Sequence, residues 1–364
     1  MNNDEKNVRK RLPTLPLQAV FSLLFIVFFT LSNADEMKTS SSLNTPRSSN
    51  ITVSEEPIQP LYLATNLDPR IVSLGKRLFN EQRLSRDNNL ACSHCHFMDE
   101  NGADHVKYNV GRNGVKLAVN TLTVFNSSLN HRFFWDGRAN SLEDQINFVV
   151  KSANEFATTW PEIIAKLASD KQYQYDFQQL YPDGITADNI RNAIATFERT
   201  LITPNSRFDQ YLLGDTNAIT QEEKKGYRLF KNYGCVACHQ GRNVGGNLFM
   251  KFGVFKDYFT ARGNPTTADL GRYNVTGKKQ DRYVFRVPSL RLAVLTAPYF
   301  HDGSVKTLEK AVELMGIHQL GRKIPEENID LIVAFLKTLP GEYNGRPLSS
   351  ATAKAMKQER NTAP

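Results

Sequence analysis

Apolar residues recur at helical spacing in two separate parts of the chain, with polar residues between them. The two stripes are Ile190, Ile194, Phe197 and Leu201, and Ile329, Ile332, Val333 and Leu336. This spacing places each stripe on one face of a helix, where it would pack into a core. Thr220, followed three residues later by Glu223, forms a capping box that predicts the start of a further helix. No strong run of alternating apolar and polar residues is present, so we expect a mainly α fold.

Three short blocks of sequence occur twice, in the same order, in the two halves of the chain. They are GKRLF at 75–79 and GYRLF at 226–230, FWDG at 134–137 and FHDG at 300–303, and FERTL at 197–201 and FLKTL at 335–339. An ordered repeat of this kind indicates a duplicated domain. We expect a first domain near residues 60–205, a second near residues 216–345 and a C-terminal tail over residues 346–364.

All four cysteines of the 364-residue chain fall in two copies of one motif. The motifs are Cys92-Ser93-His94-Cys95-His96 and Cys235-Val236-Ala237-Cys238-His239. Two thiols three apart, followed at once by a histidine, can form two thioethers to a haem and present an imidazole to its iron. The sequence therefore predicts two covalently bound haem c groups, with His96 and His239 as iron ligands, in two tandem cytochrome c-like domains.

Two other uses of the cysteines fit the sequence less well. A zinc site made from both pairs would close a loop across the 139 residues between Cys95 and Cys235, and it would not need the two histidines. Thioredoxin-like or structural disulfides would leave the histidines equally unexplained.

The N-terminus has the features of a secretory signal peptide over residues 1–34. Arg9, Lys10 and Arg11 precede an apolar run over 19–31, and the small residues Ser32 and Ala34 frame a cleavage site. The run is short for a membrane span, which favours a cleaved signal over a retained N-terminal anchor. We therefore expect a periplasmic protein, and a flexible tether over residues 35–58, which are rich in Ser, Thr and Asn.

The chain is basic, with a formal charge of +8. Removal of residues 1–34 takes away four basic and two acidic side chains, so the charge of the mature chain falls to +6. The basic residues are scattered, and no nucleic-acid-binding motif is present. The charge is consistent with solubility or with docking of an acidic partner, rather than with nucleic-acid binding.

The repeat indicates that the two haems have unequal surroundings. Met315 lies 14 residues after His301, and the same count from Trp135 in the first half reaches Val149, which cannot bind iron. A thioether ligand from Met315 would raise the potential of the second haem. Spacing alone leaves Met315 open as a ligand or a core residue, and Met250 is its rival.

With these motifs, the chain resembles the bacterial dihaem cytochrome c peroxidases and the related MauG-like dihaem enzymes. The resemblance covers about residues 70–342 and rests on LGKRLF, CSHCH, FFWDGRANSLEDQ, CVACH, FRVPSLR, LTAPYFHDGS and AVELMG, in this order. It implies that His96 holds a low-potential peroxidatic haem. It also implies that His239 and Met315 hold a high-potential haem at which electrons enter. The MauG-like branch has a tyrosine at the methionine position, so Met315 favours the peroxidases.

The resemblance also implies roles for several polar residues. Trp135 would lie between the haems on the electron path. Glu155 would be the acid-base group of the peroxide pocket, with Gln145 as its polar neighbour, although the sequence pattern alone would make Glu155 a solvated helix residue. Asn120, Thr296 and Pro298 match a calcium site at the domain interface, with the amide and backbone oxygens that this cation prefers. Members of the family are commonly homodimers.

The chain departs from the family pattern at Arg112. Eight residues before Asn120, many members carry a histidine that ligates the peroxidatic iron in the resting state. Arginine stays protonated and cannot ligate iron, and His105 is displaced by seven residues. We therefore expect the iron held by His96 to be five-coordinate or water-bound. If its loop folds over the haem, Arg112 would hydrogen-bond a departing peroxide oxygen.

These features lead to one principal hypothesis, that of an enzyme that reduces hydrogen peroxide to water. Its electrons would come from a small redox donor such as a cytochrome c, a cupredoxin or a quinol. One alternative is a MauG-like oxidase acting on a protein or organic substrate. Another, from a different class, is a non-catalytic dihaem electron carrier or redox sensor.

Overall fold

The structure is a computed structural model that describes residues 55–349. The predicted signal peptide, most of the predicted tether and the last part of the predicted tail lie outside the described residues. Within residues 55–349, no helix is both long and apolar enough to cross a membrane.

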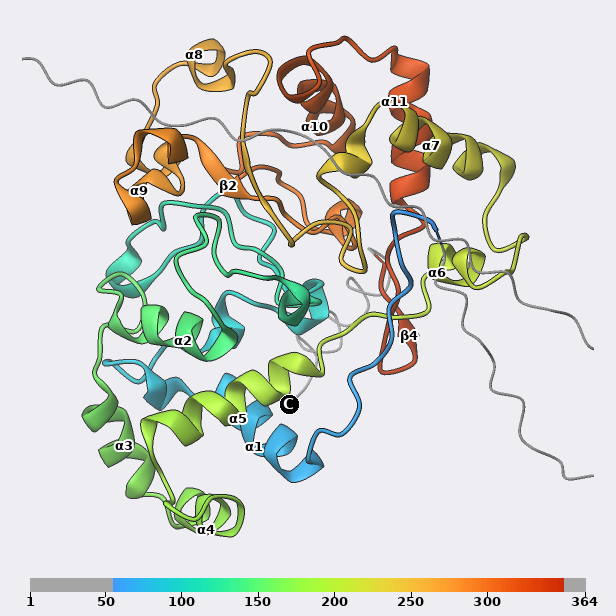
Figure 1. Cartoon of the computed structure of the whole chain (residues 1–364). Coiled ribbons are helices and arrows are strands. Elements are labelled where there is room, and N and C mark those ends of the chain that lie inside the picture. Colours follow the sequence, from blue (N-terminus) through green and yellow to red (C-terminus); the bar gives the residue numbers. More distant parts are fainter. Residues whose placement is uncertain (1–54, 350–364) are drawn as a thin grey trace, which may run out of the picture. The chain divides into compact units, whose positions relative to one another are not determined.

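The described residues are mainly helical, as the sequence predicts (Figure 1). The helices are α1 Pro69–Phe79, α2 Leu142–Lys151, α3 Trp160–Ala168, α4 Lys171–Leu180, α5 Ala187–Arg199, α6 Arg207–Leu212, α7 Gln221–Asn232, α8 Tyr258–Arg262, α9 Tyr273–Thr276, α10 Leu308–Leu314 and α11 Glu326–Leu336. Two short antiparallel pairs complete them, namely β1 Phe249–Lys251 with β2 Val284–Arg286, and β3 Glu342–Tyr343 with β4 Arg346–Pro347.

The predicted helix signals are confirmed. Thr220 Oγ1 accepts a hydrogen bond from the backbone N–H of Glu223 at 3.2 Å, and Glu223 Oε2 accepts one from the N–H of Thr220 at 2.7 Å. This capping box opens α7. The second apolar stripe lies on α11 and is buried, and the first lies on α5 except for Leu201, which is buried just after the helix ends.

Each half contains the same close crossing of two helices, α1 with α5 and α7 with α11. A Cβ added to Gly75 would lie 1.9 Å from the carbonyl oxygen of Ala193. A Cβ added to Gly226 would lie 1.9 Å from the carbonyl oxygen of Leu331. Both distances are far below van der Waals contact, so only glycine allows these helices to approach so closely. The repeat in the sequence is therefore a repeat in the structure.

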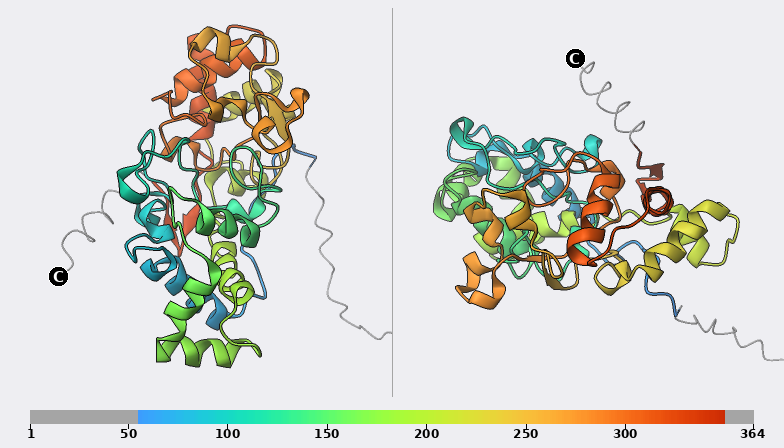
Figure 2. Two further views of the ribbon diagram at one scale, coloured as in Figure 1. Left: turned by 90° about the vertical axis from the view of Figure 1, so that its left-hand side faces the viewer. Right: turned by 90° about the horizontal axis from the view of Figure 1, so that it is seen from above.

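Each helix crossing lies in its own hydrophobic core. One core gathers buried residues of α1 to α5, and the other gathers buried residues of α7 and α11. In the left-hand view of Figure 2, the blue and green helices lie below the orange and red ones. The last described segment returns to the first core, where Leu348 is buried and Tyr343 packs edge-on against Phe125 with ring centroids 4.9 Å apart.

The start of the described chain packs against the second half. Ile58 is fully buried in the second core, and Glu56 Oε2 accepts hydrogen bonds from Tyr227 Oη at 2.5 Å and Lys231 Nζ at 2.9 Å. In Figure 1 this blue segment passes beside α6, where the N–H of Leu61 donates to Asp209 at 3.3 Å. Residues 55–58 thus differ from the expected flexible tether, because an ion pair and a buried isoleucine hold them in place.

Candidate haem sites and peroxide pocket

The second half contains a cavity with the features of a haem site. Cys235, Cys238 and His239 line it, and much of the remaining wall is apolar. The apolar residues of the wall include Phe230, Leu290, Leu308, Ile324, Ile332 and Leu336. A CxxCH motif on one wall and apolar side chains on the others suit a covalently bound, largely apolar macrocycle.

The imidazole of His239 suits an iron ligand in this cavity. Burial lowers the pKa of His239 to about 4, so the ring is neutral at physiological pH, which is the form that binds metals. Its Nδ1 is buried, and backbone groups of Val244 and Pro288 lie beside the ring. Gly245, with φ of +127°, leaves room beside the ring, since a Cβ there would lie 3.3 Å from Nδ1.

Two methionines, Met315 and Met250, line the same cavity. Met315 follows α10 at the start of a π-helical turn, Met315–Gln319, and such turns are frequent at functional sites. Met250 lies in the middle of β1, paired with Phe285 of β2. The structure therefore brings both sulfur atoms to the cavity wall, and the choice of Met315 as the iron ligand stays a prediction.

The first CxxCH motif has the same local fold. His96 N–H donates to the carbonyl oxygen of Cys92 at 3.0 Å, as His239 N–H does to that of Cys235 at 2.9 Å. The Nδ1–H of His96 donates to the carbonyl oxygen of Gly102 at 3.2 Å, which leaves the Nε2 lone pair for a metal. Burial lowers the pKa of His96, so this ring too is neutral.

The four thiols do not gather into one metal site. Cys92 packs against the first core and Cys235 against the second. Among the described residues, the one group of three or more side chains placed to share a metal ion contains no cysteine. Two separate sites, each with one CxxCH motif, fit these observations better than a single zinc site.

Trp135 contacts both halves. Its Nε1–H donates to the carbonyl oxygen of Asn120 at 2.9 Å, and its own carbonyl oxygen accepts from the N–H of Arg286 at 2.8 Å. The indole also lines the cavity of the second half. This position is compatible with the predicted place on an electron path, which stays a prediction.

Trp135 packs against His301, the residue at the equivalent position of the repeat. Phe134 and Phe300 have φ of +65° and +68°, so the FWDG and FHDG turns share a strained backbone conformation. The rings of Trp135 and His301, which follow these phenylalanines, lie edge to face with centroids 6.4 Å apart. The two equivalent turns thus meet at the boundary between the halves.

The three predicted calcium ligands, Asn120, Thr296 and Pro298, all line the same cavity as Cys235 and His239. The amide nitrogen of Asn120 donates to the carbonyl oxygen of Val106 at 2.9 Å, so its amide oxygen is the atom that a cation would use. The backbone N–H of Asn120 donates to the carbonyl oxygen of His301 at 2.8 Å, which ties this loop to the second half. The calcium ion itself stays a prediction.

Glu155 lies just after α2, and its side chain is half-buried. Burial raises its pKa, against the opposing effects of a hydrogen bond with the Ser152 side chain and of the Arg138 guanidinium. Two main causes raise the pKa of Cys95, first burial and then the negative charge of Glu155. The Glu155 carboxyl and this thiol are therefore close in space. Gln145 is half-buried on α2, but among the described residues no hydrogen bond joins it to Glu155.

Comparison with known proteins agrees with this arrangement. A family model described as di-haem cytochrome c peroxidase matches residues 69–217. The cytochrome c551 peroxidase of Nitrosomonas europaea is 44% identical over 296 residues, which cover 81% of this chain and 87% of the relative. The chain belongs to the dihaem cytochrome c peroxidase family.

Other relatives place the chain within this family. Cytochrome c peroxidase Ccp of Escherichia coli is 46% identical over 289 residues, which cover 79% of this chain but 62% of that protein, less than two thirds of its length. The crystal structure of a MauG-like protein associated with microbial copper homeostasis has a TM-score of 0.67 and 27% identity, covering 83% of this chain and 96% of that one. The chain is thus closer in sequence to these two peroxidases than to this MauG-like protein.

The loop that carries Arg112 lies beside Glu155. The N–H of Arg112 donates to the carbonyl oxygen of Asn154 at 2.8 Å, while its guanidinium Nε donates to Asp87 Oδ2 at 2.6 Å. His105 is exposed, and its Nε2 bonds to the carbonyl oxygen of Glu100 at 2.7 Å. The predicted role of Arg112 toward peroxide stays a prediction, and it requires the guanidinium to exchange its carboxylate partner.

One cluster of buried polar side chains was not expected from the sequence. The buried carboxylate of Asp269 accepts from His301 Nε2 at 2.6 Å and from Arg262 Nη2 at 2.6 Å, and Arg262 Nη1 also donates to Asp302 at 2.7 Å. Burial lowers the pKa of His301, so its Nε2–H donates as part of a neutral ring. Only the repeat of FWDG as FHDG marks His301 in the sequence, and nothing marks Asp269.

Proposed function

We propose that this protein is a periplasmic cytochrome c peroxidase that reduces hydrogen peroxide to water. It carries two covalently bound haem c groups, one in each of two tandem cytochrome c-like domains near residues 60–205 and 216–345. The observation that carries this proposal is the unequal surroundings of two similar CxxCH motifs. Sulfur atoms line the cavity near His239, whereas a carboxyl, Glu155, lies near Cys95.

The residues present fit two haems. Cys92 and Cys95 would hold the first haem, and Cys235 and Cys238 the second, with His96 and His239 as ligands of the two irons. When bound, the haems supply the redox chemistry, accepting electrons at the second site and cleaving the O–O bond of peroxide at the first. The protein supplies ligation, burial and protons. Met315 is the proposed sixth ligand at the second site, where a thioether favours a high potential.

Glu155 is the proposed acid-base group of the peroxide pocket. Its raised pKa increases the fraction of protonated carboxyl near neutral pH, which suits a group that both accepts and donates a proton. Gln145, on α2, is the proposed polar neighbour that helps to orient peroxide. Trp135, which is bonded to both halves, is the proposed intermediate on the electron path.

Four further features belong to the same proposal. A calcium ion held by Asn120, Thr296 and Pro298 would fix the boundary between the halves. The electron donor would be a small cytochrome c, a cupredoxin or a quinol, and the protein would act as a homodimer. Export through the signal peptide, or anchoring by an uncleaved leader, would place it outside the cytoplasm, where haem c is attached.

The test is a steady-state assay of peroxide consumption by the full-length protein with each class of reduced donor in turn. The proposal predicts that peroxide loss and donor oxidation occur together, with two electrons consumed for each peroxide molecule reduced to water. Oxidation of an organic or protein substrate without any such donor would favour the MauG-like alternative. Donor oxidation and re-reduction without peroxide turnover would indicate a non-catalytic carrier.

A further inference from the structure

The helices α5 and α11 end the two halves. Their contacts with the repeated glycines show which residues of the two helices are equivalent. The Cβ of Phe197 on α5 lies 2.9 Å from the position that a Cβ on Gly75 would occupy. The Cβ of Phe335 on α11 lies 3.0 Å from the corresponding position on Gly226. Phe197 and Phe335 are therefore structural equivalents, and so are the residues that follow them.

Those next residues are Glu198 in the first half and Leu336 in the second. Leu336 is 2% exposed and lines the second haem cavity together with Cys235. Glu198 is 6% exposed. The pKa of Cys92 is raised first by burial of the thiol and second by the negative charge of Glu198. The equivalence with Leu336 and the proximity to Cys92 both place the Glu198 carboxyl beside the first CxxCH motif, at the position where the second half has the apolar side chain of Leu336.

The Glu198 carboxyl is poorly compensated. Its Oε2 is buried and has no hydrogen-bond partner among the described residues. Burial, followed by the charge of Glu143, raises the pKa of Glu198 to about 8, while the Arg199 guanidinium opposes this shift. Since Arg199 Nη2 donates to Glu143 Oε1 at 2.7 Å, its positive charge is largely used by that partner.

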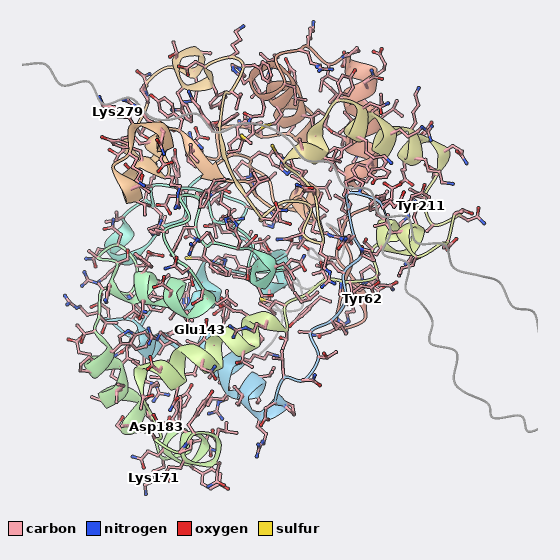
Figure 3. All side chains as sticks on the ribbon, in the orientation of Figure 1. Tyr62, Glu143, Lys171, Asp183, Tyr211 and Lys279 are labelled. Atoms are coloured by element: carbon pink, nitrogen blue, oxygen red, sulfur yellow. The ribbon has the colours of Figure 1, made fainter. Side chains whose placement is uncertain are left out.

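Few other charges face Glu198 from the elements packed against α5. Glu143 is supplied by α2 and lies beside α5 in Figure 3. The basic residues of α1, Arg70, Lys76 and Arg77, are exposed, and the 3₁₀ turn Ser127–Leu129 carries no charge. Helix α2 also carries Asp144 and Lys151. Within residues 55–349, the charges that shift the pKa of Glu198 are those of Glu143 and Arg199.

We propose that Glu198 is a proton-binding group whose ionisation is coupled to the redox state of the first haem. Glu198 takes up one proton from solvent when that haem gains one electron from the donor, and releases it when the electron leaves. Each transfer then adds no net charge to the buried surroundings of the Glu198 carboxyl, where an uncompensated charge is costly. This role differs from that of Glu155, because it concerns the charge of these surroundings and not a proton given to peroxide. The inference rests on the haem attachment proposed above at Cys92 and Cys95.

Coupling of this kind is reciprocal. If the redox state changes the proton affinity of Glu198, then the ionisation of Glu198 must change the reduction potential by the same free energy. The potential of the first haem should therefore fall as pH rises through the range in which Glu198 titrates, by up to one proton per electron. The second haem, with Leu336 at the equivalent place, should lack this component.

The experiment is a spectroelectrochemical titration of the full-length holoprotein from about pH 5 to about pH 10, a range that spans the titration of a carboxyl raised in this way. We expect Glu198→Gln and Glu198→Leu to remove most of the pH dependence of the first haem's potential. Glu326→Gln, a matched change at an exposed carboxyl at the start of α11, should leave it intact. Glu143→Gln should keep the dependence and move it to lower pH, because Glu143 helps to hold the proton on Glu198.

A second measurement detects the proton on the carboxyl directly. Within the pH range over which the potential of the first haem falls, redox-difference infrared spectra of the wild type should show a protonated-carboxyl band that appears when this haem is reduced and is absent from Glu198→Gln. Unchanged pH dependence in both Glu198 variants, or a wild type without such a band, would overturn the proposal. A pyridine haemochrome assay separates the two levels of inference. A single haem would contradict the proposed attachment, while two haems with pH-independent potentials would contradict only the role of Glu198.

Discussion

Burial of the Glu198 carboxyl should also make the stability of the protein depend on pH. The pKa of this group is about 8 in the folded chain, against an ordinary value of 4.5. Between these two values the folded state holds a proton that the unfolded state has released. The free energy of unfolding should therefore fall as pH rises through this range, because above it the folded state must bury a charge. Glu198→Gln keeps the size of the side chain and cannot ionise, so it should lack this component.

The magnitude follows from the size of the shift. A difference of about 3.5 pH units corresponds to roughly 5 kcal/mol, an upper bound if water reaches the carboxyl in the folded state. Guanidinium unfolding gives the free energy of unfolding of wild type and of Glu198→Gln at about pH 5 and about pH 9. The quantity of interest is how much the stability difference between the two proteins changes between these pH values. We expect the variant to gain stability relative to wild type by several kcal/mol between these conditions. A relative stability that is the same at both pH values would refute the buried, uncompensated carboxyl.

Three further predictions concern the proposed haem and peroxide residues. Met315→Ala should lower the reduction potential of one haem and leave the other nearly unchanged in a redox titration, because a thioether ligand favours the reduced iron; if Met250→Ala has this effect instead, Met250 is the ligand. Glu155→Gln should reduce peroxide turnover by about a hundredfold or more at unchanged haem content, and turnover within about twofold of wild type would return Glu155 to a structural role. Arg112→His should install a low-spin resting state that needs prior reduction before it reacts with peroxide, and a variant that reacts at once in the oxidised state would show that this loop does not reach the iron.

Much of the architecture could be predicted from sequence because its signals are local or repeated. The Thr220–Glu223 capping box uses contacts within one helical turn, and the apolar stripes of α5 and α11 need only the helical period. The repeated glycines, Gly75 and Gly226, mark the helix crossings of both halves. The two CxxCH motifs carry both thiols and the imidazole within five residues, so the haem sites needed no tertiary information.

The remaining features depend on contacts between residues far apart in the chain. The sequence around Glu198 gives no sign that its side chain is buried, and only the structure shows this. The guanidinium of Arg112 is held by Asp87, 25 residues away, so its orientation could not be inferred from its own loop. Asp269 is 32 residues from His301, in a segment between short helices that carries no motif.

The packing of the two terminal segments against the cores was also not predicted from the sequence. Leu348, in the predicted tail, is buried in the first core, although it follows the helices of the second half. Ile58, at the end of the predicted tether, is buried in the second core. Composition alone made both segments look like linkers, because a single apolar residue in a polar stretch gives no periodic signal.

The unequal surroundings of the two irons are tested most directly by the low-temperature EPR spectrum of the oxidised full-length protein. This spectrum reports the spin state and axial ligands of both irons at once. We predict a low-spin signal from an iron held by His239 and Met315, together with a high-spin component from an iron that has His96 as its only side-chain ligand. Two low-spin irons, in a protein that is inert to peroxide until half reduced, would contradict the account and would identify another residue, His105 first among them, as a sixth ligand of the peroxidatic haem.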